Sequence, residues 1–282
     1  MSKGLLYVVA TPIGNLDDVT IRAIKVLQNV DLIAAEDTRH TRQLLRIHGI
    51  ETPMLALHEH NERERSAQLL NRMAAGESMA LVSDAGTPLI SDPGFPLVRQ
   101  AVRQGIRVVP IPGPSALICA LSASGLPTDR FLFVGFPPRH AAQRMSWLRE
   151  LSQETATLVF YESSHRIVPA LSTMAEVFGV EREAVVAREL TKLYETFLHG
   201  GLGQLLEKVV EDPDQQLGEF VILIHGFTDQ AEDEIFVGAE KILEVLSAEL
   251  PVKQASALTS KITGQKKNEL YQRILGKKRN KM

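Results

Sequence analysis

The sequence predicts an α/β fold whose first part is a parallel sheet covered by helices on both faces. Short apolar runs alternate with helical patterns, and the runs lack the alternating polar positions of a half-exposed strand. Loops of small residues follow two of these runs, as is typical of ligand-binding strand ends in α/β proteins. The expected strands span 5–11, 31–37, 54–58, 79–84 and 108–111, and the expected helices span 20–28, 41–48, 62–75 and 94–104.

A second α/β region is expected after Pro112-Gly113-Pro114, which we interpret as a hinge or linker. A helix over 115–124 should end at Gly125 and Pro127. The pattern leaves open a mixed sheet in this region. Its strands are expected at 131–136, 157–161, 184–188 and 220–224, with helices such as 142–151 and 169–178 between them.

The end of the chain differs in charge from the rest. Residues 251–282 carry nine Lys or Arg and one Glu, a net charge of +8, so the remainder of a chain with net charge −3 carries −11. An acidic linker at 229–234 precedes an amphipathic helix at 239–250, and 253–263, Gly264 and 265–275 read as helix, turn and helix. Such a pair suits a nucleic-acid groove, a partner subunit or, on charge alone, a solvated tail. The expected domains are therefore 1–113, 114–228 and 229–282.

Composition and the termini indicate a cytosolic protein with no membrane partner. The apolar fraction of 44% and the charged fraction of 23% are ordinary for a globular chain. Cys119 is the single cysteine, which rules out an intrachain disulfide and favours a reducing compartment. The N-terminus lacks signal-peptide architecture, and no apolar run reaches the length of a membrane span.

The segment 81–94, LVSDAGTPLISDPG, is the most informative loop of the chain. An apolar strand runs into small residues that let a ligand approach the backbone, and the expected helix start has Asp92 as N-cap and Pro93 in the first turn. Asp84 suits either a cofactor group or a capping role. A second small-residue loop at 110–116 comes about one βα unit later, so the two loops predict a small-molecule cofactor site.

Several common sites are disfavoured by motifs that the sequence lacks. It contains no G-x-x-x-x-G-K-[ST], no G-x-G-x-x-G after the first strand and no G-x-S-x-G. The stretch His58-Glu59-His60 lacks a Cys or carboxylate set at ligand spacing, so no metal site is predicted.

Seven segments carry a resemblance to a known family. They are LYVVATPIGNL (6–16), AEDTR (35–39), VSDAGTP (82–88), PGPSA (112–116), FYESSHR (160–166), RELTK (188–192) and GEF (218–220). In this order they resemble the tetrapyrrole-methylase superfamily and, within it, the ribosomal RNA small-subunit methyltransferase I family. The first loop departs from the superfamily's G-x-G-P-G form by carrying Thr11 and Ile13.

The resemblance implies two α/β domains of the tetrapyrrole-methylase type with S-adenosylmethionine in the interdomain cleft, plus a small C-terminal helical domain. It implies a homodimer that methylates the ribose 2′-oxygen of a cytidine in small-subunit (16S) ribosomal RNA, either naked or in the assembled subunit. Two alternatives remain: a small-molecule, tetrapyrrole-like methyltransferase, which needs no basic tail, and a non-catalytic nucleic-acid-binding protein, which needs no paired loops.

The candidate site residues follow from these motifs and their chemistry. A weakly nucleophilic ribose hydroxyl calls for a general base or an orienting group, and Glu36 or Asp37 is expected to fill that role. Arg39 is a candidate substrate or phosphate clamp, although Asp37 could instead cap the next helix and pair with Arg39. Residues expected to bind the cofactor are Thr11, Pro12, Gly14, Asp84, Ala85, Gly86, Thr87, Ser115 and Ala116.

RNA contacts are expected to be mainly electrostatic, because aromatic residues make up only 5% of the chain. The candidates are basic side chains of the second α/β domain and of the tail: Arg166, Lys192, Lys261, Lys266, Lys267 and Arg273.

Overall fold

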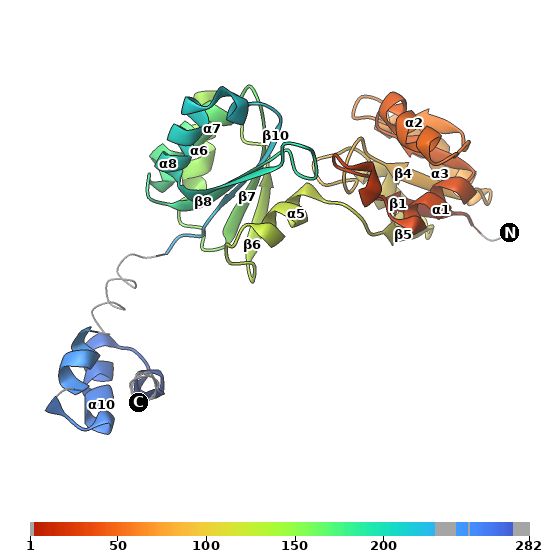
Figure 1. The fold of residues 1–282 in the computed structure, drawn as a ribbon. Helices are drawn as coiled ribbons and strands as arrows, with labels where there is room; N and C mark the ends of the chain where they lie inside the picture. Colours follow the sequence, from red (N-terminus) through yellow and green to blue (C-terminus); the bar gives the residue numbers. More distant parts are fainter. Residues whose placement is uncertain (1–2, 229–240, 248, 273–282) are drawn as a thin grey trace. The chain divides into compact units, whose positions relative to one another are not determined.

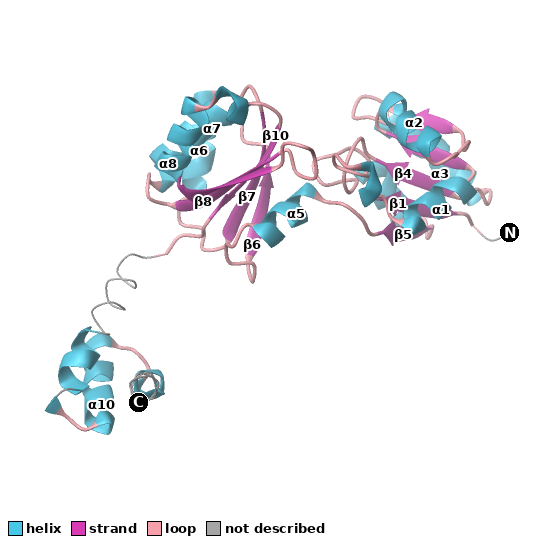
Figure 2. Ribbon diagram, in the orientation of Figure 1, coloured by secondary structure: helices cyan, strands magenta, loops and turns pink. Residues whose placement is uncertain are grey.

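Two five-stranded sheets form the framework of the first unit of the chain (Figures 1 and 2). The computed structural model describes residues 3–228, 241–247 and 249–272, and it divides into two units, Met1–Gly226 and Phe227–Met282. Within the described residues, no helix combines the length and the apolar character that crossing a bilayer requires.

The first sheet is entirely parallel, with strand order β3-β2-β4-β1-β5. Its strands are β1 (Leu5–Val9), β2 (Leu32–Ala35), β3 (Met54–Ala56), β4 (Met79–Val82) and β5 (Arg107–Ile111). Helices α1 (Ile21–Asn29) and α2 (Thr38–Ile47) cover one face, while α3 (Glu62–Ala74) and α4 (Phe95–Arg103) cover the other.

Strand β2 shows why the pattern lacks polar alternate positions. Ile33 packs into the core beneath α1 and α2, whereas its neighbour Leu32 packs into the opposite core beneath α3 and α4. Both faces are therefore buried, and the prediction of a doubly covered parallel sheet is confirmed.

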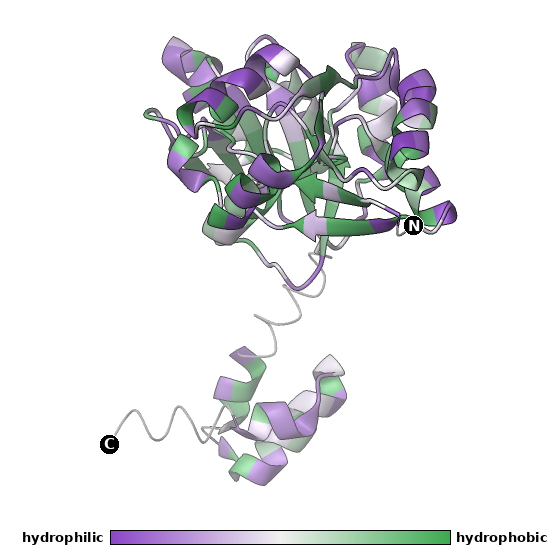
Figure 3. Ribbon diagram, turned by 90° about the vertical axis from the view of Figure 1, so that its right-hand side faces the viewer, coloured by the Kyte–Doolittle hydropathy of each residue, from purple (hydrophilic) through white to green (hydrophobic). Residues whose placement is uncertain are grey.

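The second sheet is mixed, with strand order β6-β7-β10-β8-β9. Its strands are β6 (Phe131–Gly135), β7 (Thr157–Ser163), β8 (Glu183–Arg188), β9 (Thr196–Gly201) and β10 (Glu219–Ile224), of which only β6 and β7 are parallel neighbours. Helices α6 (Ala141–Glu150), α7 (Ile167–Phe178) and α8 (Leu202–Glu211) cover one face, and α5 (Ala116–Ala123) covers the other. Figure 3 shows that the strands of the first unit are its most hydrophobic elements and that hydrophilic residues gather on the outer helices.

Strand β9 was not predicted from the sequence, and α4 begins later than its expected N-cap. Strand β9 lies at the sheet edge, is half-exposed and ends in two glycines, so it carries no strand-like apolar run. The prediction that Asp92 caps α4 was wrong: the helix begins at Phe95, and its N-cap is Gly94 with φ +114°. Pro96, rather than Pro93, occupies the first turn.

The second unit contains helical segments at 241–247 and 267–272 on either side of α10 (Val252–Thr263). Its small core contains Leu243, Ala255 and Leu270. Gly264, with φ +75°, ends α10 at the expected turn. The predicted helices also included 239–240 and 273–275, and these residues and Arg273 lie outside the described part of the chain.

Candidate active site

A cavity of about 290 Å³ is lined by loops of the first sheet on one side and by strands of the second sheet on the other. This volume is near the lower end of small-molecule pockets, which run from roughly 300 to 1,000 Å³. From the first sheet, the loops after β1, β4 and β5 contribute Ile13, Ala85, Gly86, Thr87, Ile90, Ser91, Asp92, Ser115 and Ala116. The second sheet contributes Phe136, Tyr161, Glu162, Ser163, Leu190, Glu219, Phe220 and Val221.

The topology explains why these segments meet. Parallel strands β1, β4 and β5 all end at one edge of the first sheet, so their loops are neighbours. In the second sheet, β10 runs antiparallel to β7, which places Glu219 opposite Ser163. The start of one strand and the end of the other thereby form a single wall of the cavity.

Hydrogen bonds to backbone groups hold the three loops of the first sheet together. Thr11 and Gly86 exchange N–H···O bonds of 2.9 and 3.0 Å, and the Thr87 hydroxyl donates to the Pro114 carbonyl at 3.0 Å. Gly86 has φ +80°, and a Cβ there would lie 3.3 Å from Ile13 Cγ2, so glycine suits both the conformation and the space. Gly14, in contrast, packs under the Lys192 side chain, where a Cβ would lie 2.4 Å from Lys192 Cγ.

Two cavity loops contain non-glycine residues in the left-handed region. Leu89 (φ 77°) and Ser91 (φ 69°) flank Ile90, while Glu189 (φ 51°) and Thr191 (φ 65°) flank Leu190. Ile90 and Leu190 both line the cavity. Left-handed backbone is unfavourable for residues with a Cβ, at roughly 1–2 kcal/mol each.

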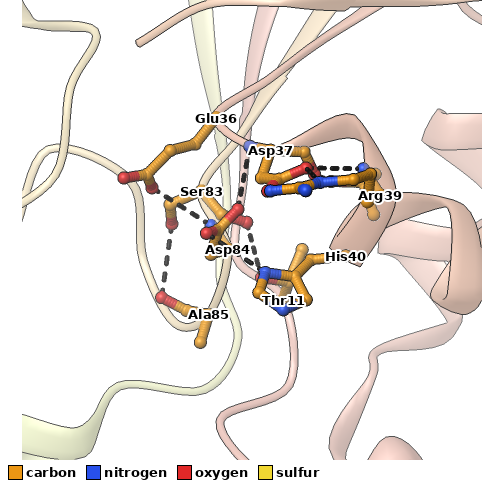
Figure 4. A network of polar contacts seen from close by, with 9 residues as sticks. Thr11, Glu36, Asp37, Arg39, His40, Ser83, Asp84 and Ala85 are labelled. Carbon is orange, nitrogen blue, oxygen red and sulfur yellow. Dashed lines mark hydrogen bonds and ion pairs between the residues drawn. The ribbon is translucent and has the colours of Figure 1, made fainter. Parts of the chain in front are cut away.

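Asp84 joins the ends of β2 and β4 in a network shown in Figure 4. Its Oδ1 accepts the Asp37 amide at 2.9 Å, its own amide donates to Glu36 Oε2 at 3.3 Å, and its Oδ2 lies 3.3 Å from His40 Nδ1. The network confirms that these strand ends are adjacent. The Asp84 carboxylate is thus directed at the start of α2, and among the described residues neither Asp84 nor Glu36 lines the cavity.

Asp37 and Glu36 have different surroundings although they are adjacent in sequence. Asp37 is the N-cap of α2, where it accepts the Arg39 amide at 2.8 Å, and its Oδ2 lies 2.5 Å from Arg39 Nη2. These contacts hold the pKa of Asp37 far below its usual range. Burial raises the pKa of Glu36, and the neighbouring carboxylates of Asp84, Glu59 and Asp37 add to the rise. Asp37 is therefore held by Arg39, whereas Glu36 lies among other carboxylates.

Asp92 lines the cavity, although its sequence context predicted a helix N-cap. Burial raises the pKa of its carboxyl group to about 6, and the charges of Glu36 and Asp84 act in the same direction, while contact with the Ser83 side chain opposes them. Its position in the cavity wall follows from the turn at Ser91 and Gly94, two residues with positive φ.

Glu162 is almost completely buried, with 2% of its surface exposed, and it also lines the cavity. Its Oε1 accepts the Ser163 amide at 2.9 Å and lies 3.3 Å from Arg166 Nε. Within the described part of the chain, Oε2 has no hydrogen-bond partner. A buried carboxylate oxygen left without a partner is costly, which marks it as an acceptor for a ligand's hydrogen-bond donor.

The basic residues expected to contact RNA fall into two groups. Arg166 pairs with Glu162 and donates to the Pro137 carbonyl, and Lys192 Nζ lies 2.8 Å from Glu189 and 2.9 Å from Glu219. Lys261, Lys266 and Lys267 are exposed on the second unit. Among the described residues, no group of three or more His, Cys, Asp or Glu could hold a metal ion.

Two family models match the chain. Residues 5–206 match the Tetrapyrrole (Corrin/Porphyrin) Methylases, and residues 233–278 match the RsmI C-terminal HTH domain. The first match covers the first sheet, the second sheet through β9 and the first half of α8, and the second covers the helical unit.

Curated relatives match over nearly their whole length. A protein of Pseudomonas aeruginosa named Ribosomal RNA small subunit methyltransferase I is 54% identical over 276 residues, covering 98% of each chain. The protein of the same name from Escherichia coli O157:H7 is 51% identical over 274 residues, covering 97% of this chain and 96% of the relative.

Solved structures resemble the first unit in fold. Diphthine synthase matches with a TM-score of 0.59 at 16% identity, over 79% of this chain and 90% of the other. Uroporphyrin-III C-methyl transferase from Thermus thermophilus, complexed with S-adenyl homocysteine, matches with a TM-score of 0.53 at 21% identity, over 78% of this chain and 97% of the other.

Proposed function

The chain belongs to the ribosomal RNA small subunit methyltransferase I family, and from this premise we propose that it methylates the ribose 2′-oxygen of a cytidine in 16S ribosomal RNA, with S-adenosylmethionine as methyl donor. The observation that carries the proposal is the cavity, which combines three small-residue loops with the unpartnered carboxylate oxygen of Glu162. That oxygen would repel an anionic ligand such as a phosphate group, whereas it attracts a cationic one.

The polar groups that line the cavity fit S-adenosylmethionine. When bound, this cofactor supplies a methyl group on a cationic sulfur, together with an ammonium group, a ribose diol and an adenine. Glu162 Oε2 can accept a hydrogen bond from the ammonium or a ribose hydroxyl, and the Glu162 carboxylate favours a cation electrostatically.

The small-residue loops are assigned to the cofactor's polar and planar parts. Ala85, Gly86 and Thr87 line the cavity, and Ser115 and Ala116 line it at the start of α5. Thr11, Pro12 and Gly14 are assigned to holding the first loop, whose Ile13 lines the cavity. Asp84 is assigned an electrostatic part, since its carboxylate faces α2.

On the substrate side, Glu36 is assigned to orienting the incoming hydroxyl. Asp37 is assigned to holding Arg39, whose side chain is 85% exposed and keeps guanidinium donors free for an RNA phosphate. The exposed lysines Lys261, Lys266 and Lys267 give the second unit its RNA contacts, and Arg273 is assigned with them. Arg166 and Lys192 contribute a weaker attraction, because acidic partners balance their charge. We further propose a homodimer acting in the cytoplasm.

Methyl transfer to defined acceptors tests this function. The purified protein would be incubated with S-adenosylmethionine carrying a tritiated methyl group and with naked 16S RNA, assembled small subunits or a tetrapyrrole. We expect label in 2′-O-methylcytidine after digestion of the RNA to nucleosides. Label on the tetrapyrrole, or in base-methylated nucleosides only, would contradict the proposal, and the comparison of the two RNA forms identifies the substrate.

A further inference from the structure

Asp92 occupies a place in the cavity that its local sequence does not explain. It belongs to the loop between β4 and α4, yet it does not cap α4, because that helix begins three residues later behind Gly94. Its side chain is partly buried in the cavity wall. Among the described residues, no Lys, Arg or His forms an ion pair with it.

The proposed reaction requires a proton acceptor at this cavity. As the ribose oxygen forms a bond to the methyl carbon, the carbon–sulfur bond breaks and its electron pair goes to sulfur, which becomes neutral. The ribose O–H must then give up its proton, since the oxygen would otherwise carry a positive charge. A positioned base that takes this proton contributes typically 10²–10⁴-fold to the rate.

The other carboxylates near the cavity are committed elsewhere. Asp37 is held by Arg39, and Glu219 pairs with Lys192. Glu36 accepts the Asp84 amide and stands outside the cavity wall. Glu162 binds Ser163 and Arg166 through Oε1. Its free Oε2 is assigned above to the cofactor. Asp92 is thus the carboxylate in the cavity wall that combines access with freedom from a cationic partner.

We propose that Asp92 is the catalytic base that accepts the proton of the ribose 2′-hydroxyl, an inference that rests on the proposed function. Its carboxylate receives the proton as the oxygen–carbon bond forms and releases it to solvent after the product leaves. Tyr161 of β7, Glu36 after β2 and Asp84 after β4 are the titratable groups that face it.

The electrostatics of this position suit the role. Burial together with Glu36 and Asp84 raises the pKa of Asp92 to about 6. Such a group is mostly ionised at neutral pH and is yet a stronger base than an ordinary aspartate, which titrates near 4.

The test compares full-length wild-type protein with Asp92→Asn, Asp92→Glu and the exposed control Asp129→Asn. Single-turnover methyl transfer to RNA would be measured from pH 5 to 9. We expect the wild-type and control rates to rise with pH up to a midpoint near 6 and then to level off. Asp92→Asn should lose roughly 100-fold or more and show no such midpoint. Asp92→Glu should keep part of the rate with a shifted midpoint.

Two measurements do not depend on turnover. Carbon-13 carboxyl NMR of the free protein should show an aspartate titrating near pH 6 that is absent in Asp92→Asn and present in Asp129→Asn. Calorimetry should show that Asp92→Asn binds S-adenosylmethionine within about threefold of wild type, since the asparagine keeps the shape of the side chain.

The outcomes separate this inference from the function on which it rests. Wild-type rate and an unchanged pH midpoint in Asp92→Asn would overturn the inference and leave RNA methylation standing. Cofactor affinity that falls in step with the rate would also overturn it, because Asp92 would then be a binding residue. A wild-type protein that labels no RNA would refute the proposed function itself.

Discussion

The Tyr161 hydroxyl accepts a hydrogen bond from the Leu117 amide at 3.1 Å, so strand β7 of the second sheet holds the first turn of α5. First-turn amides have no partner within their own helix, and here a side chain supplies one. Ser115 and Ala116, which line the cavity, directly precede this contact. The position of the cavity loop after β5 therefore depends on a residue of the second sheet.

Removing this hydroxyl should cost stability. We expect Tyr161→Phe to lower the free energy of unfolding by about 1 kcal/mol, because the buried Leu117 amide loses its acceptor. Urea denaturation of the full chain measures the change. Tyr194→Phe is the matched control, since Tyr194 is 67% exposed. Equal stability of wild type and Tyr161→Phe would show that the contact contributes nothing.

Glu162 should be important for cofactor affinity. We expect Glu162→Gln to weaken S-adenosylmethionine binding by about tenfold or more, because a charged acceptor contributes roughly 1.5–3 kcal/mol to a buried hydrogen bond. Isothermal titration calorimetry measures the affinity, and Glu150→Gln on the exposed face of α6 serves as control. Unchanged affinity with an intact fold would remove Glu162 from the cofactor site.

Substitutions at two glycines with nearly the same backbone conformation distinguish the effect of backbone strain from the effect of filling the cavity. Gly86 (φ +80°) faces Ile13 in the cavity, whereas Gly125 (φ +75°) has open space around it. Alanine at either position should lower stability by roughly 1–2 kcal/mol. Only Gly86→Ala should also weaken cofactor binding in calorimetry. A similar loss of affinity in Gly125→Ala would point to a general effect of destabilisation.

The exposed lysines of the second unit should set the salt dependence of RNA binding. Replacing Lys261, Lys266 and Lys267 by glutamine should reduce the slope of log affinity against log salt by roughly 2–3, because each phosphate that a lysine neutralises adds about 0.7–0.9 to that slope. Filter binding at several salt concentrations measures the slope. Arg22→Gln with Lys25→Gln on α1 is the control, and an equal change there would indicate only a reduced net charge.

Asp92 should make the stability of the protein fall between about pH 4 and pH 6. Its folded pKa of about 6 exceeds the unfolded value near 4, so the native state binds more protons in that interval. The free energy of unfolding therefore declines as pH rises, and the loss is complete above pH 6. Asp92→Asn removes this term and should be more stable than wild type at pH 8 by on the order of 2 kcal/mol, with little difference below pH 4. A difference independent of pH would contradict the shifted pKa.

The fold was largely predictable because its cause is local. Strand β2 is apolar on both faces. Such a run predicts a strand buried on both faces whatever its position in the sheet. In a parallel sheet Glu36 and Asp84 both follow strand ends at one edge, and the hydrogen bond between them shows that they are neighbours.

Other features depend on contacts that no local pattern encodes. The Asp-Pro pair at 92–93 has the chemistry of a helix start, but Gly94 adopts φ +114° and turns the chain so that Asp92 lines the cavity. The sequence places Glu162 at a strand end, but its burial and its unpartnered oxygen emerge only from the folded chain. Strand β9 lies at the sheet edge, where hydrogen bonds to the preceding strand β8 rather than composition define it.

The left-handed residues on either side of Ile90 and Leu190 have a consequence for evolution of the cavity. Glycine at position 89, 91 or 191 would relieve backbone strain without removing an ion pair, so each change should stabilise the chain when no cofactor is present. The same change would let the loop adopt many conformations in the free protein. Ordering the loop when the cofactor binds would then cost entropy and weaken the binding. A search for thermostable variants should therefore find these three positions readily, at the expense of affinity for the methyl donor.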